Sequence, residues 1–74
     1  MVGARIKAYL QSKGIKQIWL TEKTGLTKDA VSDIVNNDRR IEVTEYVRIC
    51  MALGVPLETF VKEEMAAGEE EVNE

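Results

Sequence analysis

The feature that most constrains this chain is a glycine between two short helical segments. Residues 17–24 form an amphipathic stretch, Gly25 and Leu26 follow it, and Thr27 precedes a second stretch over about 28–35. Glycine ends a helix at low cost because it accepts a left-handed backbone, and a threonine hydroxyl can cap the next helix. Two helices joined by so short a turn must cross steeply. The pattern therefore predicts a helix-turn-helix over about 17–35.

Apolar spacing predicts three further helices, over about 4–13, 43–53 and 57–66. A glycine follows each of the first two, and Pro56 is suited to open the last. In the turn after the 28–35 helix, Asn37 is the better candidate for a left-handed residue because asparagine tolerates that conformation. No alternating strand pattern of useful length occurs. The expected fold class is all-α, a compact five-helix domain.

The periodic apolar positions indicate which side chains form the core. Thr21 fits between helices if its hydroxyl bonds to a backbone carbonyl of its own helix. If Trp19 is exposed, the C-terminal segment or a partner subunit could cover it. The expected core includes Leu20, Leu26, Val31, Ile34 and Cys50.

Composition limits the classes of function. A chain of 74 residues with 45% hydrophobic and 31% charged residues is typical of one globular domain. No apolar run approaches the ~20 residues of a membrane helix, and no signal peptide heads the chain. One cysteine cannot form an intrachain disulfide, and a chain without histidine has no ordinary zinc site. We therefore expect a cytoplasmic protein without metal, cofactor, membrane partner or small-molecule ligand. Because no catalytic constellation is evident, we do not expect an enzyme.

The net charge of −3 is distributed unevenly. Residues 1–62 hold all ten Lys and Arg residues and seven acidic ones, a net charge of +3, whereas residues 63–74 hold six Glu and no basic residue, a net charge of −6. Clustered positive charge is what a surface needs to bind nucleic acid. The charge split is compatible with a nucleic-acid-binding surface, and we expect a helix-turn-helix domain over 1–67 followed by a disordered acidic tail over 68–74.

A set of positions in register matches a known family pattern: Gln17, Leu20-Thr21, Gly25, Leu26, Thr27, Val31-Ser32, Ile34, Asn36-Asn37 and Ala52-Leu53-Gly54-Val55. With these positions, the chain from about Ile6 to Phe60 resembles the lambda-repressor-like (Cro/Xre-type) helix-turn-helix DNA-binding family. The resemblance implies a sequence-specific transcriptional regulator of the repressor type, a homodimer whose recognition helix at about 28–35 enters the major groove of double-stranded DNA.

The resemblance also implies a set of DNA-binding residues. Gln17 is expected to donate to a phosphate and to help hold the first residue of the recognition helix, although an exposed polar residue is also ordinary at a helix start. The complete implied set is Gln17, Thr27, Lys28, Asp29, Ser32, Asp33, Asn36, Arg39 and Arg40.

The four outward residues of the recognition helix are its candidate readers of base edges. Lys28 can donate to guanine O6 and N7 or to phosphate, and Ser32 can donate or accept. Asp29 and Asp33 can accept from cytosine N4 but repel phosphates, and Asp29 also complements the helix dipole as a first-turn acid.

The resemblance implies that the loop after the recognition helix lies against the DNA backbone. Asn36, Arg39 and Arg40 are its candidate phosphate contacts, because Arg matches phosphate bidentately. The alternative is a solvated charged turn.

A second class of function also stays open, namely a protein-interaction module on the same fold, such as an antitoxin, anti-repressor or adaptor. The acidic recognition face, Trp19 and the acidic tail favour this alternative.

Overall fold

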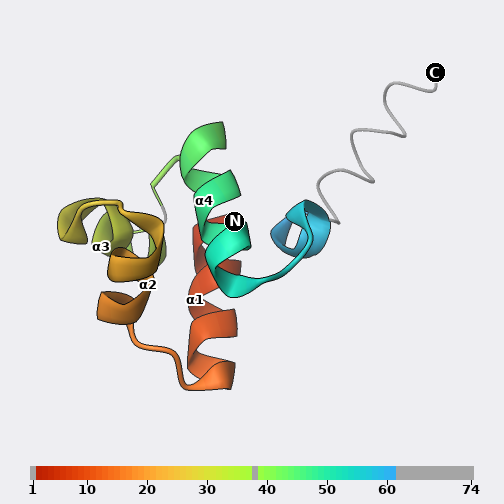
Figure 1. Ribbon diagram of the computed structural model, residues 1–74, viewed down its shortest axis with the longest axis horizontal. Coiled ribbons are helices and arrows are strands. Elements are labelled where there is room, and N and C mark those ends of the chain that lie inside the picture. The colour runs from red at the N-terminus through yellow and green to blue at the C-terminus, as the bar shows by residue number, and fades with distance from the viewer. Residues whose placement is uncertain (1, 38, 62–74) are drawn as a thin grey trace.

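Four α-helices and a 3-10 turn follow one another in the computed structural model, which describes residues 2–37 and 39–61 (Figure 1). Over these residues no strand occurs, which confirms the predicted all-α fold class. The helices predicted over 4–13, 17–24, 28–35 and 43–53 are all present, with bounds within two residues of those predicted. The elements are α1 (Val2–Lys13), α2 (Gln17–Thr24), α3 (Lys28–Asn36), α4 (Val43–Leu53) and η1 (Leu57–Phe60).

The fifth element differs from the prediction. We expected an α-helix over about 57–66, but Leu57–Phe60 is a 3-10 turn. The Phe60 N–H donates to the Tyr46 hydroxyl (3.3 Å) instead of an α-helical carbonyl, while the Tyr46 hydroxyl itself donates to the Leu57 carbonyl. Burial, with the adjacent Cys50 thiol, raises the pKa of Tyr46 to about 12, so this hydroxyl keeps its proton at neutral pH. Residues 62–67 and the predicted tail over 68–74 lie outside the described residues.

The core lies where the four helices meet. Helix α1 packs against α3, and α2 packs against both α3 and α4. Phe60 closes the core from the η1 side, with its ring perpendicular to Tyr9 and Tyr46 at centroid distances of 5.6 and 6.3 Å. In Figure 1, η1 and α3 lie on opposite sides of α1 and α4. The buried apolar side chains are Ile6, Leu10, Leu20, Val31, Ile34, Val35, Ile49, Cys50 and Phe60.

This core contains most of the predicted set. Leu20, Val31, Ile34 and Cys50 are buried as expected, and Leu26 packs against them while partly exposed. Burial also raises the pKa of the Cys50 thiol. The predicted bond of the Thr21 hydroxyl to a carbonyl of its own helix is present, to Gln17 O at 3.1 Å.

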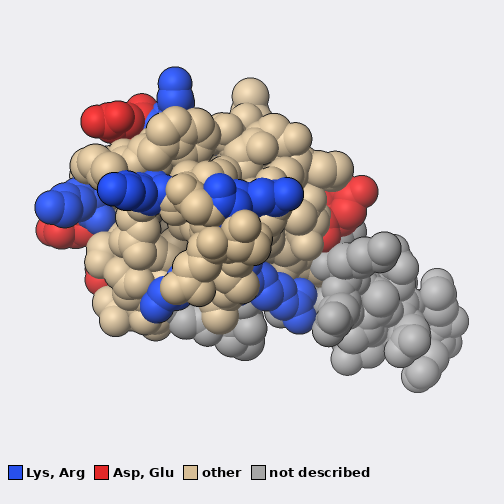
Figure 2. All heavy atoms as spheres, turned by 90° about the horizontal axis from the view of Figure 1, so that it is seen from below, with Lys and Arg blue, Asp and Glu red and all other residues tan. Residues whose placement is uncertain are grey.

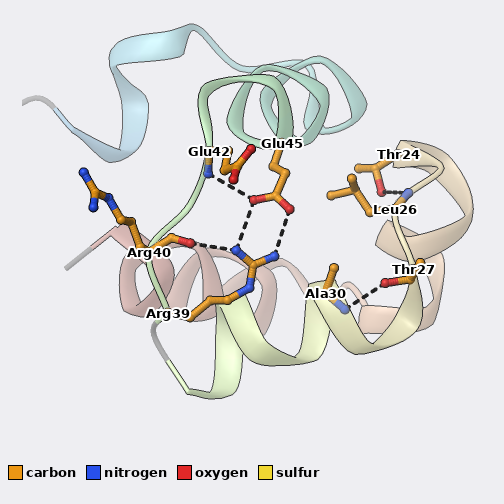
Figure 3. Close-up of polar contacts among 8 residues, drawn as sticks. All are labelled: Thr24, Leu26, Thr27, Ala30, Arg39, Arg40, Glu42 and Glu45. Carbon is orange, nitrogen blue, oxygen red and sulfur yellow. Dashed lines mark hydrogen bonds and ion pairs between the residues drawn. The ribbon is translucent and has the colours of Figure 1, made fainter.

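The turn between α2 and α3 has the predicted chemistry. Gly25 is left-handed (φ 78°), and its N–H donates to Thr21 O at 3.1 Å. The Thr27 hydroxyl accepts a hydrogen bond from Ala30 N–H at 3.0 Å and so caps α3 (Figure 3).

Thr24 stabilises the same turn in a way that helical spacing does not predict. This side chain is the buried polar one in the described core. Its hydroxyl donates to Leu20 O at 2.7 Å and accepts from Leu26 N–H at 3.2 Å (Figure 3). The hydrogen bond is partly buried, and a backbone N–H without a partner is costly there, so the Thr24 hydroxyl stabilises the turn.

The prediction of a left-handed Asn37 is wrong: its φ and ψ are −108° and 2°. The end of α3 is closed by hydrogen bonds instead. Asn37 N–H and Arg39 N–H both donate to Asp33 O, at 3.1 and 3.2 Å. The Asn37 amide also donates to the Asp33 carboxylate at 3.0 Å. Hydrogen bonds to the backbone carbonyl and to the carboxylate of Asp33 therefore take the place of a left-handed residue.

Replacing Thr24 with Val should test the importance of this turn. Thr24→Val keeps the shape but leaves Leu26 N–H without an acceptor, so the free energy of unfolding should fall by about 1–3 kcal/mol. Thr21→Val is the matched control, because its partly exposed hydroxyl donates only within its own helix, and it should change stability by less than about 0.5 kcal/mol. Urea unfolding measures both, and equal losses would show that the Thr24 hydroxyl has no special role.

Candidate nucleic-acid interface

Helix α3 presents a polar outer face because its inner face is fixed in the core. Val31, Ile34 and Val35 are buried, and the Thr27 cap fixes the first turn. Residues three and four apart share a helix face, so two polar rows result. One row holds Lys28, Ser32 and Asn36, and the other holds Asp29 and Asp33. Ser32 is half-buried, whereas the other four are exposed.

Three of the predicted site residues form one hydrogen-bonded group. Gln17 Nε2 donates to Asn36 Oδ1 at 3.1 Å, and Asn36 Nδ2 donates to Gln17 Oε1 at 3.3 Å and to Ser32 Oγ at 3.2 Å. We expected Gln17 to hold the first residue of the recognition helix, but its partner is the last one. The start of α2 is thereby tied to the end of α3.

The two acidic residues of α3 have different surroundings. Asp29 lies in the first turn, where it complements the helix dipole. The Asp33 carboxylate accepts from the Asn37 amide, and it contributes to the raised pKa of Arg39. Asp33 is therefore oriented by the end of its own helix, and its charge is partly balanced by a nearby guanidinium.

Arg39 joins the loop after α3 to the start of α4. Its guanidinium donates to both carboxylate oxygens of Glu45, at 3.2 and 2.8 Å, and to Arg40 O at 2.7 Å (Figure 3). Glu45 also accepts from Glu42 N–H at 3.0 Å, and Glu42 and Glu45 form the capping box of α4. The hydrogen bonds from Arg39 and then from Glu42 N–H lower the pKa of Glu45, and the bond to Glu45 raises the pKa of Arg39.

Arg40 is placed differently from its neighbour. Its side chain is exposed and points away from the ion pair in Figure 3. The sequence suggested two equivalent cations after the recognition helix. The structure separates them, because Arg39 is engaged by a carboxylate whereas Arg40 extends toward solvent.

The described residues contain neither a candidate membrane-spanning helix nor a candidate metal cluster. None of the helices there has the length and apolar character to cross a bilayer. Within 2–37 and 39–61, His, Cys, Asp and Glu side chains form no group of three that could hold a metal ion.

Comparison with known proteins gives one match. A family model described as helix-turn-helix matches residues 6–60, which contain the turn, the outer face of α3 and the Arg39 loop. This span agrees with the resemblance noted from the sequence and confirms it. No curated protein and no solved structure matches the chain.

The Arg39–Glu45 pair should make stability depend on pH in the acid range. The folded-state pKa of Glu45 lies below its ordinary value of 4.5, so its contribution is complete above that value and is lost as pH falls through the lowered pKa. Glu45→Gln should therefore lower the melting temperature at pH 7, and the difference from the unmodified chain should shrink toward pH 2–3 as Glu45 becomes protonated.

Glu22→Gln, at an exposed glutamate of α2, is the control and should show little difference at either pH. A Glu45→Gln effect that is the same at pH 7 and at pH 2–3 would show that the carboxylate charge does not contribute.

Proposed function

This chain belongs to the Cro/C1-type helix-turn-helix family of DNA-binding regulators, and from that premise we propose that it is a repressor-like transcriptional regulator. In this proposal the outer face of α3 enters the major groove of double-stranded DNA in the cytoplasm. The family match over residues 6–60 carries the proposal. The anchored inner face and polar outer face of α3 support it, because a rigid helix can hold side chains at fixed positions along base edges.

Lys28 and Ser32 are the proposed base readers. They lie one turn apart on one row of α3, near the N-terminal end that enters the groove in this class of proteins. Lys28 donates to guanine, while Ser32 contacts a base edge next to it. The carboxylates of Asp29 and Asp33 add selectivity for base sequence. They can accept a hydrogen bond from cytosine N4, and they repel phosphates. Thr27 lies at the edge of this face, where its backbone approaches a phosphate.

Gln17 and Arg40 are the proposed contacts to the DNA backbone. A glutamine amide has two N–H donors, and Asn36 receives one from Gln17, which leaves the second available for a phosphate oxygen. Both N–H donors of Asn36 are engaged, by Gln17 and Ser32, so Asn36 orients its neighbours. Arg39 is proposed to position Arg40, because its hydrogen bond to Arg40 O helps to fix the loop that carries Arg40.

A homodimer is part of the same proposal. Helix α3 has nine residues, so one copy covers only a short half-site, and two copies would read half-sites about 34 Å apart on one face of DNA. Val43 and Met51, on α4, and Leu57, on η1, are exposed apolar side chains outside the α3 face. These residues offer apolar surface for pairing that leaves α3 free.

Arg40→Ala and Lys28→Ala should change DNA binding in two different ways. Arg40→Ala should weaken binding to all duplexes similarly and reduce the slope of log affinity against log salt by about 1, because one phosphate contact is lost. Lys28→Ala should instead change which sequences are preferred, with a loss of about 1–3 kcal/mol of discrimination at one base pair.

Selection of bound sequences from random duplexes, followed by salt titrations on the selected duplex, measures both effects and the number of chains bound per duplex. Lys7→Ala, on α1, is the matched control and should leave both the preference and the affinity ranking unchanged. Uniform weakening by Lys28→Ala would make Lys28 a phosphate contact. Absence of salt-dependent binding by the unmodified chain would favour the protein-interaction module.

A further inference from the structure

A shallow groove lies beside α2, and none of its lining residues is assigned to DNA contact. It has a volume of about 450 Å³ and lies between the α1–α2 loop and α2. Its floor is apolar: Ile18 and Trp19 keep 51% and 36% of their surface exposed, so two large hydrophobic side chains face solvent together. The lining residues are Gly14, Ile15, Lys16, Ile18, Trp19 and Glu22.

More basic than acidic side chains border this apolar groove. Lys16 and Glu22 are in its lining, Lys23 Nζ lies 5.8 Å from the Trp19 ring centroid, and Lys13 directly precedes Gly14. Figure 2 views the end of the molecule that carries the α1–α2 loop. There Lys and Arg side chains run across the middle of the face, and acidic side chains lie toward its edges. An apolar floor with a basic rim fits a segment that is both apolar and acidic.

We propose that the groove is the docking site of the chain's own acidic C-terminal segment, residues 63–74. This segment places Met65, Ala66 and Ala67 between two groups of glutamates, with six Glu and no basic residue in all. Its apolar residues match the floor of the groove, and its glutamates match the lysines at the rim. A free acidic peptide could offer the same chemistry, but a tethered segment is present at millimolar effective concentration.

A series of contacts connects the end of the described chain with the side of α1 that leads to this groove. Phe60 packs on Tyr9 of α1, and Lys13 Nζ lies 5.8 Å from the same Tyr9 ring. Lys13 leads directly into Gly14, the first residue of the groove wall. The distance along α1 from Tyr9 to Gly14 is only about 7.5 Å.

The segment is long enough to make this path. Five to seven extended residues after Phe60 span about 17–25 Å, which reaches beyond Lys13 and brings Met65, Ala66 and Ala67 to the groove. In the proposed docked arrangement, the later glutamates can pair with the Lys and Arg side chains that Figure 2 shows across this end of the molecule. Docking removes Ile18 and Trp19 from water and pairs the −6 segment with the +3 remainder of the chain.

Trp19 is the only tryptophan of the chain, so its fluorescence reports directly on the groove. The test uses the full-length chain and a full-length variant in which all six glutamates of 63–74 are changed to Gln. If the segment covers Trp19, the acrylamide quenching constant should rise about twofold in the variant, because the ring becomes exposed. In 1 M NaCl, where the Debye length is about 3 Å, the unmodified chain should approach the variant.

Two single substitutions make the assignment specific. Lys16→Gln, in the groove wall, should raise quenching of Trp19, whereas Lys28→Gln, at the start of α3, should leave it unchanged. Met65→Gln should also expose Trp19, because it removes the apolar anchor but keeps every glutamate. Circular dichroism establishes that each variant keeps its helices.

Equal quenching in the unmodified chain and the six-fold variant would overturn the proposal. Quenching that increases on dilution of the unmodified chain would assign the contact to a second copy and overturn the intramolecular docking.

Discussion

The hydrogen bonds that close the turn between α2 and α3 determine where each proposed DNA contact lies. The Thr24 hydroxyl satisfies Leu26 N–H, Gly25 provides the left-handed residue, and the Thr27 hydroxyl caps α3 at Ala30 N–H. These interactions fix the direction in which α3 leaves the turn. Val31, Ile34 and Val35 then fix its rotation by burying one face, and the opposite face becomes the polar surface.

The other end of α3 is held by interactions between residues far apart in sequence. Gln17 and Asn36, nineteen positions apart, exchange amide hydrogen bonds, and the Arg39–Glu45 pair attaches the following loop to the capping box of α4. This arrangement gives neighbouring residues different roles. Arg39 and Asn36 orient the surface, while Arg40 and the second N–H of Gln17 are available to a ligand. An interface with oriented contact groups loses less conformational entropy on binding.

Local sequence signals accounted for the helices, because their causes are local. Gly25 and Thr27 mark a helix end and a helix start through their own backbone and side-chain chemistry, and apolar spacing identified Leu20 and Ile34 as core. The errors arose where tertiary contacts override local preference. The Tyr46 hydroxyl takes the Phe60 N–H and leaves a 3-10 turn, and bonds to Asp33 O close α3 without a left-handed Asn37. For the candidate site, the sequence supplied the residues through family resemblance, but the separate role of Arg39 depends on Glu45, six positions away.

The central claim is that the outer face of α3, the start of α2 and the loop at Arg40 form one DNA-binding surface. Amide chemical-shift mapping of the isotope-labelled chain, titrated with a duplex selected from random sequences, tests it most directly. The account predicts that the largest salt-dependent shifts fall on Lys28, Ser32, Gln17 and Arg40. Shifts concentrated on the outer residues of α4, such as Val43 and Met51, with α3 unchanged, would contradict it.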